Sequence, residues 1–388
     1  MVEVLLFAVA LIASTFMAWA IGAGSSGATP FAPAVGANAI SVLRAAFVVG
    51  LLGFAGAALQ GASVSEAVGS ELIVGITLPI SAVIVALLTA AGLMAIGIFT
   101  GYPIATAFTV TGAVIGAGLA LGGDPAWGKY AEIGTMWLLT PFVGGGFAYA
   151  IASVLPHKDV PESASVPVLA AIVGAIVVNI EFALLASGDE LASLAVAISR
   201  ALPVQPELTR TLVTLTGIVV AGGLVRFDIV RNGLDGLKRF LLVLGGLVAF
   251  SAGASQVGLA VGPLVPLFEG TVLSVTALAA GGGIGLLVGS WTGAPRLIKA
   301  VAQDYSSLGP RRSISALVPS FALAQVAVLY GIPVSFNQII VSGIVGAGMA
   351  VGGGDVISRR KILFTVGAWI GSFLLAFALG FGIMIAVH

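Results

Sequence analysis

The stretch AIGAGSSGATPFAPAVGANAI, residues 20–40, interrupts an apolar segment with glycines, hydroxyl side chains and two prolines, at a point where a membrane helix would otherwise continue. In hydrocarbon, backbone N–H and C=O groups without hydrogen-bond partners are costly, so irregular backbone persists at membrane depth only where it lines a cavity or is buried in protein. The interruption therefore predicts a binding site in this part of the chain.

The interruption has a counterpart in the second half of the chain. From residue 252 the chain reads AGASQVGLAVGPLVPL, in which two glycines and an alanine repeat the first stretch at one constant offset. The segments GYPIATAFTVTGAVIGAGLALGG, 101–123, and GIPVSFNQIIVSGIVGAGMAVGG, 331–353, repeat at almost the same offset. Interrupted helices at corresponding places of two related halves are typical of secondary transporters, whose half-helix N-termini point at an anionic substrate near the bilayer midplane. Glycines inside the regular apolar runs are instead predicted to be helix-packing contacts: Gly116, Gly118, Gly346 and Gly348.

The composition predicts a membrane protein before any motif is used. The chain has 388 residues, of which 59% are hydrophobic and 8% are charged, and its mean hydropathy is +1.16. Soluble domains carry about 25% charged residues, so we expect a polytopic membrane protein with short loops and no soluble domain. The chain contains no cysteine, which excludes disulfides, thiolate metal sites and a cysteine nucleophile. Its zero net charge gives no indication of a nucleic-acid partner.

Twelve apolar segments predict an all-α polytopic membrane protein, because each is near the length of about 20 residues that a bilayer crossing needs. The segments are 3–38 (broken near 22–33), 41–61, 72–99, 103–121, 130–155, 166–187, 207–225, 240–262 (broken near 253–258), 271–293, 313–329, 335–353 and 362–387. The runs that meet at Gly101 and Gly331 are joined by almost no loop, so two helical hairpins are expected. We predict a first repeat over 1–155, connecting helices and a cytoplasmic loop over 156–239, and a second repeat over 240–388.

The basic residues predict how the chain is oriented. If the N-terminus lies outside, the inner loops hold most of the lysines and arginines, and the outer segments hold only Lys129, Arg200 and Arg210. This bias places both termini outside in a multi-pass protein of the plasma membrane. The two repeats then enter the membrane from opposite faces, as inverted repeats. The tryptophans are predicted to lie mainly near the membrane interfaces: Trp19, Trp127, Trp137, Trp291 and Trp369.

At these positions the chain resembles the inorganic phosphate transporter (PiT) family. Each half of that family carries a GANDVANA-like motif and, later, a P-[VI]-S-T-T-H-A segment that runs into a glycine-spaced helix. The corresponding segments here are GAGSSGAT at 22–29, GASQVGLA at 253–260, PIATAFT at 103–109 and PVSFNQI at 333–339. The stretch GGGIGLLVGSWTGAPRLIKAVAQ at 281–303 is similar to the family's glycine-rich helix and the inner loop after it, and the resemblance covers nearly the whole chain.

The resemblance implies a site in which two broken helices and two hairpins enclose one tetrahedral oxyanion, with sodium bound beside it in phosphate symporters. The family's Asn and Asp of the first motif correspond to Gly24 and Ser25, and those of the second to Ser255 and Gln256, so both acidic positions are neutral here. The residues expected to bind the substrate are Gly24, Ser25, Ser26, Thr29, Thr106, Ser255, Gln256, Ser335 and Asn337. Related carriers are often dimers, so a homodimer in the lipid bilayer is also expected.

The loss of both acidic positions leaves two substrates open. Near neutral pH phosphate still carries a proton, and a carboxylate can accept the hydrogen bond that this P–OH group donates. Sulfate has no such proton and would be repelled by a carboxylate, whereas hydroxyls, amides and helix N-termini donate hydrogen bonds to it without net charge. The resemblance favours phosphate and the neutral site favours sulfate, so both remain candidates.

The coupling ion is expected to be a proton rather than sodium, because the two motif carboxylates that would ligate sodium are missing. Glu181 lies in an apolar run and is a candidate proton carrier, but its position near a predicted outer loop also fits a carboxylate that reaches the lipid headgroups. No cofactor or metal is expected. The chain is not expected to be an enzyme, since the predicted spans contain no His or Lys for a catalytic cluster. An anion channel is the remaining alternative to a symporter, because half-helices also build pores.

Overall fold

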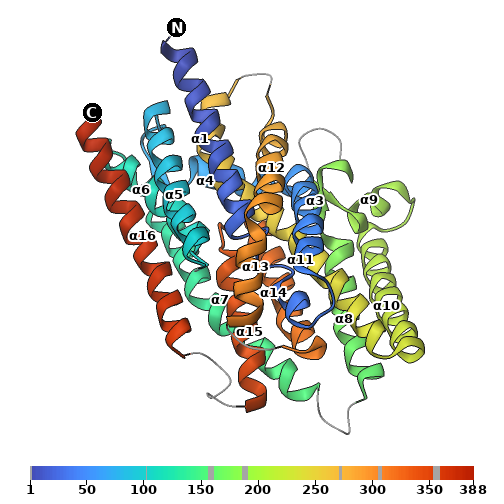
Figure 1. Cartoon of the computed structure of the whole chain (residues 1–388). Helices are drawn as coiled ribbons and strands as arrows, with labels where there is room; N and C mark the ends of the chain where they lie inside the picture. The colour runs from blue at the N-terminus through green and yellow to red at the C-terminus, as the bar shows by residue number, and fades with distance from the viewer. Residues whose placement is uncertain are drawn as a thin grey trace.

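The computed structural model describes residues 2–101, 103–155, 161–185, 191–270, 273–304, 308–352 and 359–388, which are mainly helical (Figure 1). The first half contains helices α1 (Val2–Gly24), α2 (Ala32–Gly36), α3 (Val42–Gln60), α4 (Ala62–Ser70), α5 (Ile80–Thr100), α6 (Thr106–Ala120) and α7 (Trp127–Val154). The middle contains α8 (Glu162–Asn179), the 3-10 turn η1 (Ala183–Leu185), α9 (Leu194–Ala201) and α10 (Pro206–Asn232). The second half contains α11 (Leu234–Val261), the 3-10 segment η2 (Gly262–Phe268), α12 (Val275–Thr292), α13 (Ala294–Asp304), α14 (Pro310–Leu329), α15 (Phe336–Gly352) and α16 (Arg359–Val387). Two short antiparallel pairs join loops: β1 (Ile73–Val74) with β2 (Asp124–Pro125), and β3 (Glu181–Phe182) with β4 (Ala192–Ser193).

Ten of the described helical segments are long and apolar enough to cross a membrane, and α6 and α15 contain shorter apolar helices. Together they correspond to the twelve predicted segments, which confirms an all-α polytopic membrane protein. How many of them cross the bilayer stays a prediction. The segment predicted to begin at residue 72 becomes helical only at Ile80. The short helices α4, α9 and α13 were not predicted, because none is long enough to be a crossing.

The first predicted break is observed. α1 ends at Gly24, where two successive backbone N–H groups share one carbonyl oxygen, and the helix resumes as α2. A Cβ atom on Gly27 would lie 1.9 Å from the carbonyl oxygen of Gly22. Only glycine therefore lets the turn fold back onto the end of α1.

The second predicted break, near 253–258, is wrong. α11 continues through these residues to Val261 and ends just before Pro263. A Cβ atom on Gly253 would lie 1.8 Å from the carbonyl oxygen of Gly53, so this glycine permits close packing of α11 on α3. The α-helical bonding ends at the proline instead, because proline has no N–H to donate, and the chain continues as the 3-10 segment η2.

Both predicted hairpins are present, one joining α5 to α6 and the other joining α14 to α15. Gly101 follows α5 with a φ of 76°, and Gly331 follows α14 with a φ of 60°. These are left-handed values that favour glycine, because a Cβ atom strains the backbone there. The two glycines therefore turn the chain at matching positions of the two halves.

Helices of one half pack on helices of the other half. In the repeat, α1 matches α11, α3 matches α12, α6 matches α15 and α7 matches α16. α1 packs on α12 and α11 packs on α3, while α6 packs on α16 and α15 packs on α7. The short elements follow the same pattern, because α2 packs on α13 and η2 packs on α4. Each half therefore covers the apolar helices of the other, and the two halves form one interlocked bundle.

Matching helices also run in opposite directions. α6 and α7 are antiparallel, because a short connection joins them and Phe108 near the start of α6 stacks on Trp137 of α7. α6 and α16 are parallel, because Gly112 faces Phe373 and Gly116, one turn later on α6, faces Phe377, one turn later on α16. The matching helices α7 and α16 are therefore antiparallel, and the two termini lie at the same end of the bundle (Figure 1). Inverted repeats require these directions, and the inverted repeat stays a prediction.

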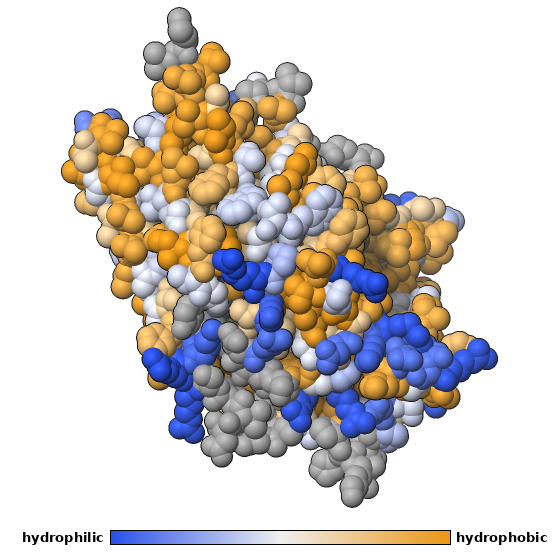
Figure 2. Space-filling model, in the orientation of Figure 1, coloured by the Kyte–Doolittle hydropathy of each residue, from blue (hydrophilic) through white to orange (hydrophobic). Residues whose placement is uncertain are grey.

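Hydrophilic and hydrophobic residues separate along the bundle. Figure 2 shows hydrophilic residues gathered toward the end opposite the two termini, with hydrophobic residues over most of the face above them. Lipid contact favours such an apolar band, and basic loops favour the cytoplasmic side. The pattern agrees with the predicted orientation, which itself stays a prediction.

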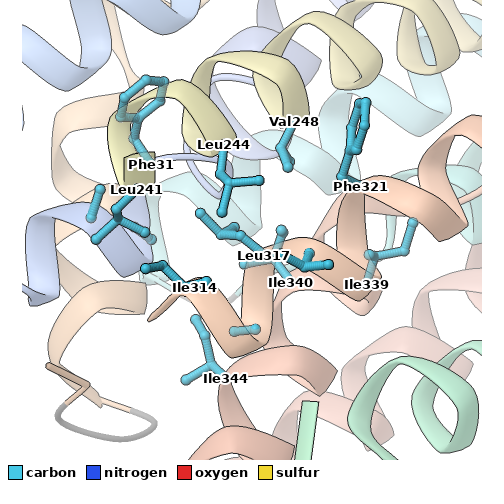
Figure 3. Packing of buried hydrophobic residues seen from close by; sticks show 14 of the residues in the cluster. Phe31, Leu241, Leu244, Val248, Ile314, Leu317, Phe321, Ile339, Ile340 and Ile344 are labelled. Carbon is cyan, nitrogen blue, oxygen red and sulfur yellow. The ribbon is translucent and has the colours of Figure 1, made fainter. Parts of the chain in front are cut away.

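The largest buried cluster joins α11, α14 and α15. Figure 3 shows side chains from these three helices and from the turn after α1 in contact: Phe31, Leu241, Leu244, Val248, Ile314, Leu317, Phe321, Ile339, Ile340 and Ile344. This packing fixes the second hairpin against α11 and beside the first break. The first break and the second hairpin, which the sequence predicts to bind the substrate, are thereby held together.

The close helix packing leads to a first test at Gly346. A Cβ atom there would lie 2.0 Å from the carbonyl oxygen of Gly145, whereas one on Gly367 would meet nothing within 4 Å. We expect Gly346→Ala to push α15 from α7 and to lower the free energy of unfolding by about 1–3 kcal/mol. Gly367→Ala is the matched control and is expected to unfold like the unmodified protein. Thermal unfolding in detergent measures both, and equal unfolding temperatures would contradict the packing role.

Candidate functional site

One asparagine joins three segments that are distant in the sequence. The Nδ2 group of Asn337, at the start of α15, donates hydrogen bonds to the carbonyl oxygen of Gly24 at 2.9 Å and to that of Ile104 at 2.6 Å. On α11, the Nε2 group of Gln256 donates to the carbonyl oxygen of Val334 at 2.5 Å. Both hairpin tips, the end of α1 and α11 therefore meet. We call this region the junction: residues 24–25, 104–106, 255–256 and 334–337.

The predicted binding residues are all buried, and most of them lie in the junction. The hydroxyls of Ser26 and Thr29 instead bond to backbone carbonyls of their own turn, at 3.5 Å and 3.1 Å. These two residues shape the turn rather than offer free donors. The other predicted residues come together: Gly24, Ser25, Thr106, Ser255, Gln256, Ser335 and Asn337.

Four hydroxyl groups of the junction have no hydrogen-bond partner among the described residues, and all four side chains have 0% of their surface exposed: Ser25, Thr106, Ser255 and Ser335. A buried polar group left without a partner costs about 1–3 kcal/mol, so native proteins rarely keep one without a reason. Four such groups on four segments that meet indicate a site for a small polar ligand.

The two junction amides have a different role from the one predicted. We expected Gln256 and Asn337 to donate hydrogen bonds to the anion. Both N–H groups of Asn337 and one of the two of Gln256 donate to backbone carbonyls instead, which leaves one N–H of Gln256 for a ligand. Their side-chain oxygens, Oε1 and Oδ1, have no partner in the described part of the chain. The junction therefore offers hydroxyl groups together with two neutral acceptors.

Two helix N-termini also reach the junction. α6 begins at Thr106 and α15 at Phe336, and no side chain caps the N-terminus of α6. The first N–H groups of a helix have no intrahelical partner, and the helix dipole makes this end favourable for negative charge. The N-termini of α6 and α15 therefore add backbone donors that suit a small oxyanion.

Two tryptophans hold the hairpin tips at matching positions. The indole N–H of Trp369 donates to the carbonyl oxygen of Pro103 at 2.8 Å, and that of Trp137 donates to the carbonyl oxygen of Pro333 at 2.9 Å. We predicted the tryptophans to lie mainly near the membrane interfaces, which stays a prediction, and the bonds of these two to the hairpin tips were not predicted. The two tryptophans are separated in the sequence by nearly the same number of residues as the two repeated segments. This spacing was the signal that could have revealed their role.

Charged side chains are absent from the junction as defined, whose polar groups are hydroxyls, amides and backbone atoms. Within the described residues, no group of three or more His, Cys, Asp or Glu side chains could hold a metal ion. The arrangement can thus bind an anion by hydrogen bonds and helix dipoles alone.

Comparison with known proteins gives one consistent result. The model of the phosphate transporter family matches residues 21–380. A protein of Thermococcus kodakarensis named "Putative phosphate permease" is 25% identical, with 89% of this chain and 88% of that protein covered. The Arabidopsis thaliana protein named inorganic phosphate transporter 2-1, chloroplastic, is 24% identical, with 88% and 65% covered. A solved structure, "The sodium-dependent phosphate transporter", has the same fold, with a TM-score of 0.79, 21% identity and 98% of each chain covered.

The tryptophan anchors can be tested by local stability. Trp369→Phe keeps an aromatic ring but removes the N–H that bonds to Pro103, so we expect the free energy of unfolding to fall by about 1–3 kcal/mol. Amide hydrogen exchange should rise in the first hairpin tip, 103–108. Trp127→Phe is the control, because Trp127 is 74% exposed. Unchanged exchange at the tip in Trp369→Phe would contradict the anchoring role.

Proposed function

Since this chain belongs to the phosphate transporter family, we propose that it is a permease that carries inorganic phosphate across the membrane as a secondary active transporter. The family is one of transporters rather than enzymes, and the chain is a multi-pass membrane protein. The names of its relatives, phosphate permease and inorganic phosphate transporter, support the substrate. We place it in the plasma membrane with both termini outside, as the basic residues predict.

The observation that carries the proposal is the set of four unpartnered hydroxyls in the junction, on Ser25, Thr106, Ser255 and Ser335. A tetrahedral oxyanion has four oxygens that can accept hydrogen bonds from donors on several sides. The hydroxyls come from the end of α1, from α11 and from both hairpin tips. An anion bound there would therefore contact all four of these segments.

The acceptors of the junction favour phosphate over sulfate. The free oxygens of Gln256 and Asn337 can each accept a hydrogen bond from a P–OH group. Sulfate near neutral pH has no proton to donate, so it would face these oxygens without a compensating bond. Sulfate was the alternative because the motif carboxylates are missing, but neutral amide oxygens supply the acceptor that phosphate needs.

The closed junction favours a carrier over an open channel. The site residues are buried, and the two short-element pairs, α2 with α13 and η2 with α4, pack within the bundle at matching positions. A channel needs a continuous path, whereas a carrier opens its site to one side at a time. We propose symport with a cation as the driving reaction, and a homodimer as the assembly.

A matched pair of threonines on α6 tests the site. Thr106 and Thr109 are both fully buried, but the Thr106 hydroxyl has no partner and the Thr109 hydroxyl donates to the carbonyl oxygen of Ala105 at 3.0 Å. We expect Thr106→Val to weaken phosphate binding by about 10- to 150-fold, because a hydrogen bond to a charged group contributes about 1.5–3 kcal/mol. Thr109→Val is expected to change the affinity little. Equilibrium binding of labelled phosphate measures both, and equal affinities would remove Thr106 from the site.

Competition between anions tests the substrate. We expect a large excess of sulfate to leave the initial rate of labelled phosphate uptake into proteoliposomes nearly unchanged. Arsenate keeps a protonated oxygen and should compete. If sulfate inhibits as strongly as unlabelled phosphate, the preference inferred from Gln256 and Asn337 is wrong.

A further inference from the structure

A cavity of about 390 Å³ lies between the ends of α3, α8 and α14 and the strand β3. We call it the Glu181 cavity, after the half-buried carboxylate in its wall. The other polar side chains that line it and enter the argument are Gln60, Asn179, Thr214 and Gln325. The function proposed above uses none of them.

A chain of hydrogen bonds leads from this cavity toward the junction. The Nε2 group of Gln60 donates to Oε1 of Gln325 at 3.3 Å, and the Nε2 group of Gln325 donates to the hydroxyl of Ser251 at 2.6 Å. Ser251 lies one turn before Ser255 on α11. The ring of Phe182, which follows Glu181, packs against that of Phe250, which precedes Ser251, with ring centroids 5.7 Å apart. The strand β3, which carries Glu181, therefore packs against the part of α11 that leads to Ser255.

The cavity wall offers free acceptors, and its remaining donors are the second N–H groups of Gln60 and Gln325. Oε1 of Gln60 has no partner among the described residues, although Gln60 is only 4% exposed. Asn179 donates through Nδ2 to the carbonyl oxygen of Ala175 and to the hydroxyl of Thr214, so it can offer only Oδ1 to a ligand. The hydroxyl of Thr214 donates to a backbone carbonyl. A carboxylate with neutral oxygens and few free donors suits a small cation and disfavours an anion.

We propose that the Glu181 cavity receives the cation that drives transport, and that the Glu181 carboxylate binds it, as a proton or as sodium. This inference rests on the proposed function, because it assigns the coupling site of the same carrier. A cation there would draw Gln60 toward Glu181 and change the bonded chain that ends one turn from Ser255. Binding in the cavity and binding at the junction would then be linked.

The charged and titratable groups near the cavity are few. Near the cavity end of the surrounding elements, the described groups are Glu66 on α4 and Glu71 after it, Arg200 on α9, Glu207 and Arg210 on α10, and Tyr330 after α14. The other charged residues of these helices lie toward their opposite ends: Arg44, Glu162, Arg226, Asp228, Arg231, Arg311 and Arg312. Asp189 and Glu190 lie outside the described residues. Glu181 is the carboxylate in the cavity wall itself, so it is the residue to change.

The test separates coupling from transport in proteoliposomes that contain the full chain. Phosphate exchange, with phosphate on both sides and no ion gradient, measures movement of the anion alone. Accumulation under an inward proton gradient or an inward sodium gradient measures coupling. We expect Glu181→Gln to keep exchange within about twofold of the unmodified protein and to lose accumulation above equilibrium under either gradient. Glu181→Asp should accumulate phosphate, and Glu207→Gln, exposed at the start of α10, is the matched control.

Each outcome decides the question. The gradient that drives accumulation by the unmodified protein identifies the cation. Accumulation by Glu181→Gln equal to that of the unmodified protein overturns the inference, and so does a folded Glu181→Gln protein that loses exchange as well. If the unmodified protein exchanges no phosphate, the proposed function fails instead. A cysteine placed at Leu329, a cavity residue in a chain without cysteines, gives a readout without transport, since the cation alone should slow its modification several-fold.

Discussion

The cost of burying a polar group without a partner is the constraint on which this structure depends. Inside a membrane protein such groups cannot turn to water, so they are kept only where a ligand or a structural bond satisfies them. Here four hydroxyls without partners among the described residues gather where two hairpin tips, α11 and the end of α1 meet. The amides and indoles around them are used to hold backbone carbonyls in place, which positions the hydroxyls before a ligand arrives.

The exchange of partners between the halves suits the proposed carrier, which would open one small site from two sides. Matching helices pack on one another's partners, and the matching helices α7 and α16 run in opposite directions. The anchors Trp137 and Trp369 are part of this symmetry, because each holds the hairpin tip of the other half. In the proposed carrier the halves would move as rigid bodies while the tips stay at the substrate.

The sequence predicted the fold class, the first break and both hairpins, because hydropathy and glycine positions report directly on membrane helices. It failed where a residue's role depends on its distant neighbours. Gly253 was interpreted as a break but packs against α3, and the motif alone cannot distinguish these roles. Asn337 was interpreted as an anion donor, but both of its N–H bonds go to carbonyls that lie far away in the sequence. The residues of the Glu181 cavity were not grouped by any motif, since they come from separate helices.

In the proposed function, phosphate binds at an uncharged junction of hairpin tips and helix ends. An experimental structure of the purified protein saturated with phosphate tests it most directly. We expect tetrahedral density whose oxygens lie about 2.5–3.0 Å from the hydroxyls of Ser25, Thr106, Ser255 and Ser335. Phosphate bound instead among the basic residues at the end of the bundle, with these four hydroxyls bonded to water or to protein, would contradict it.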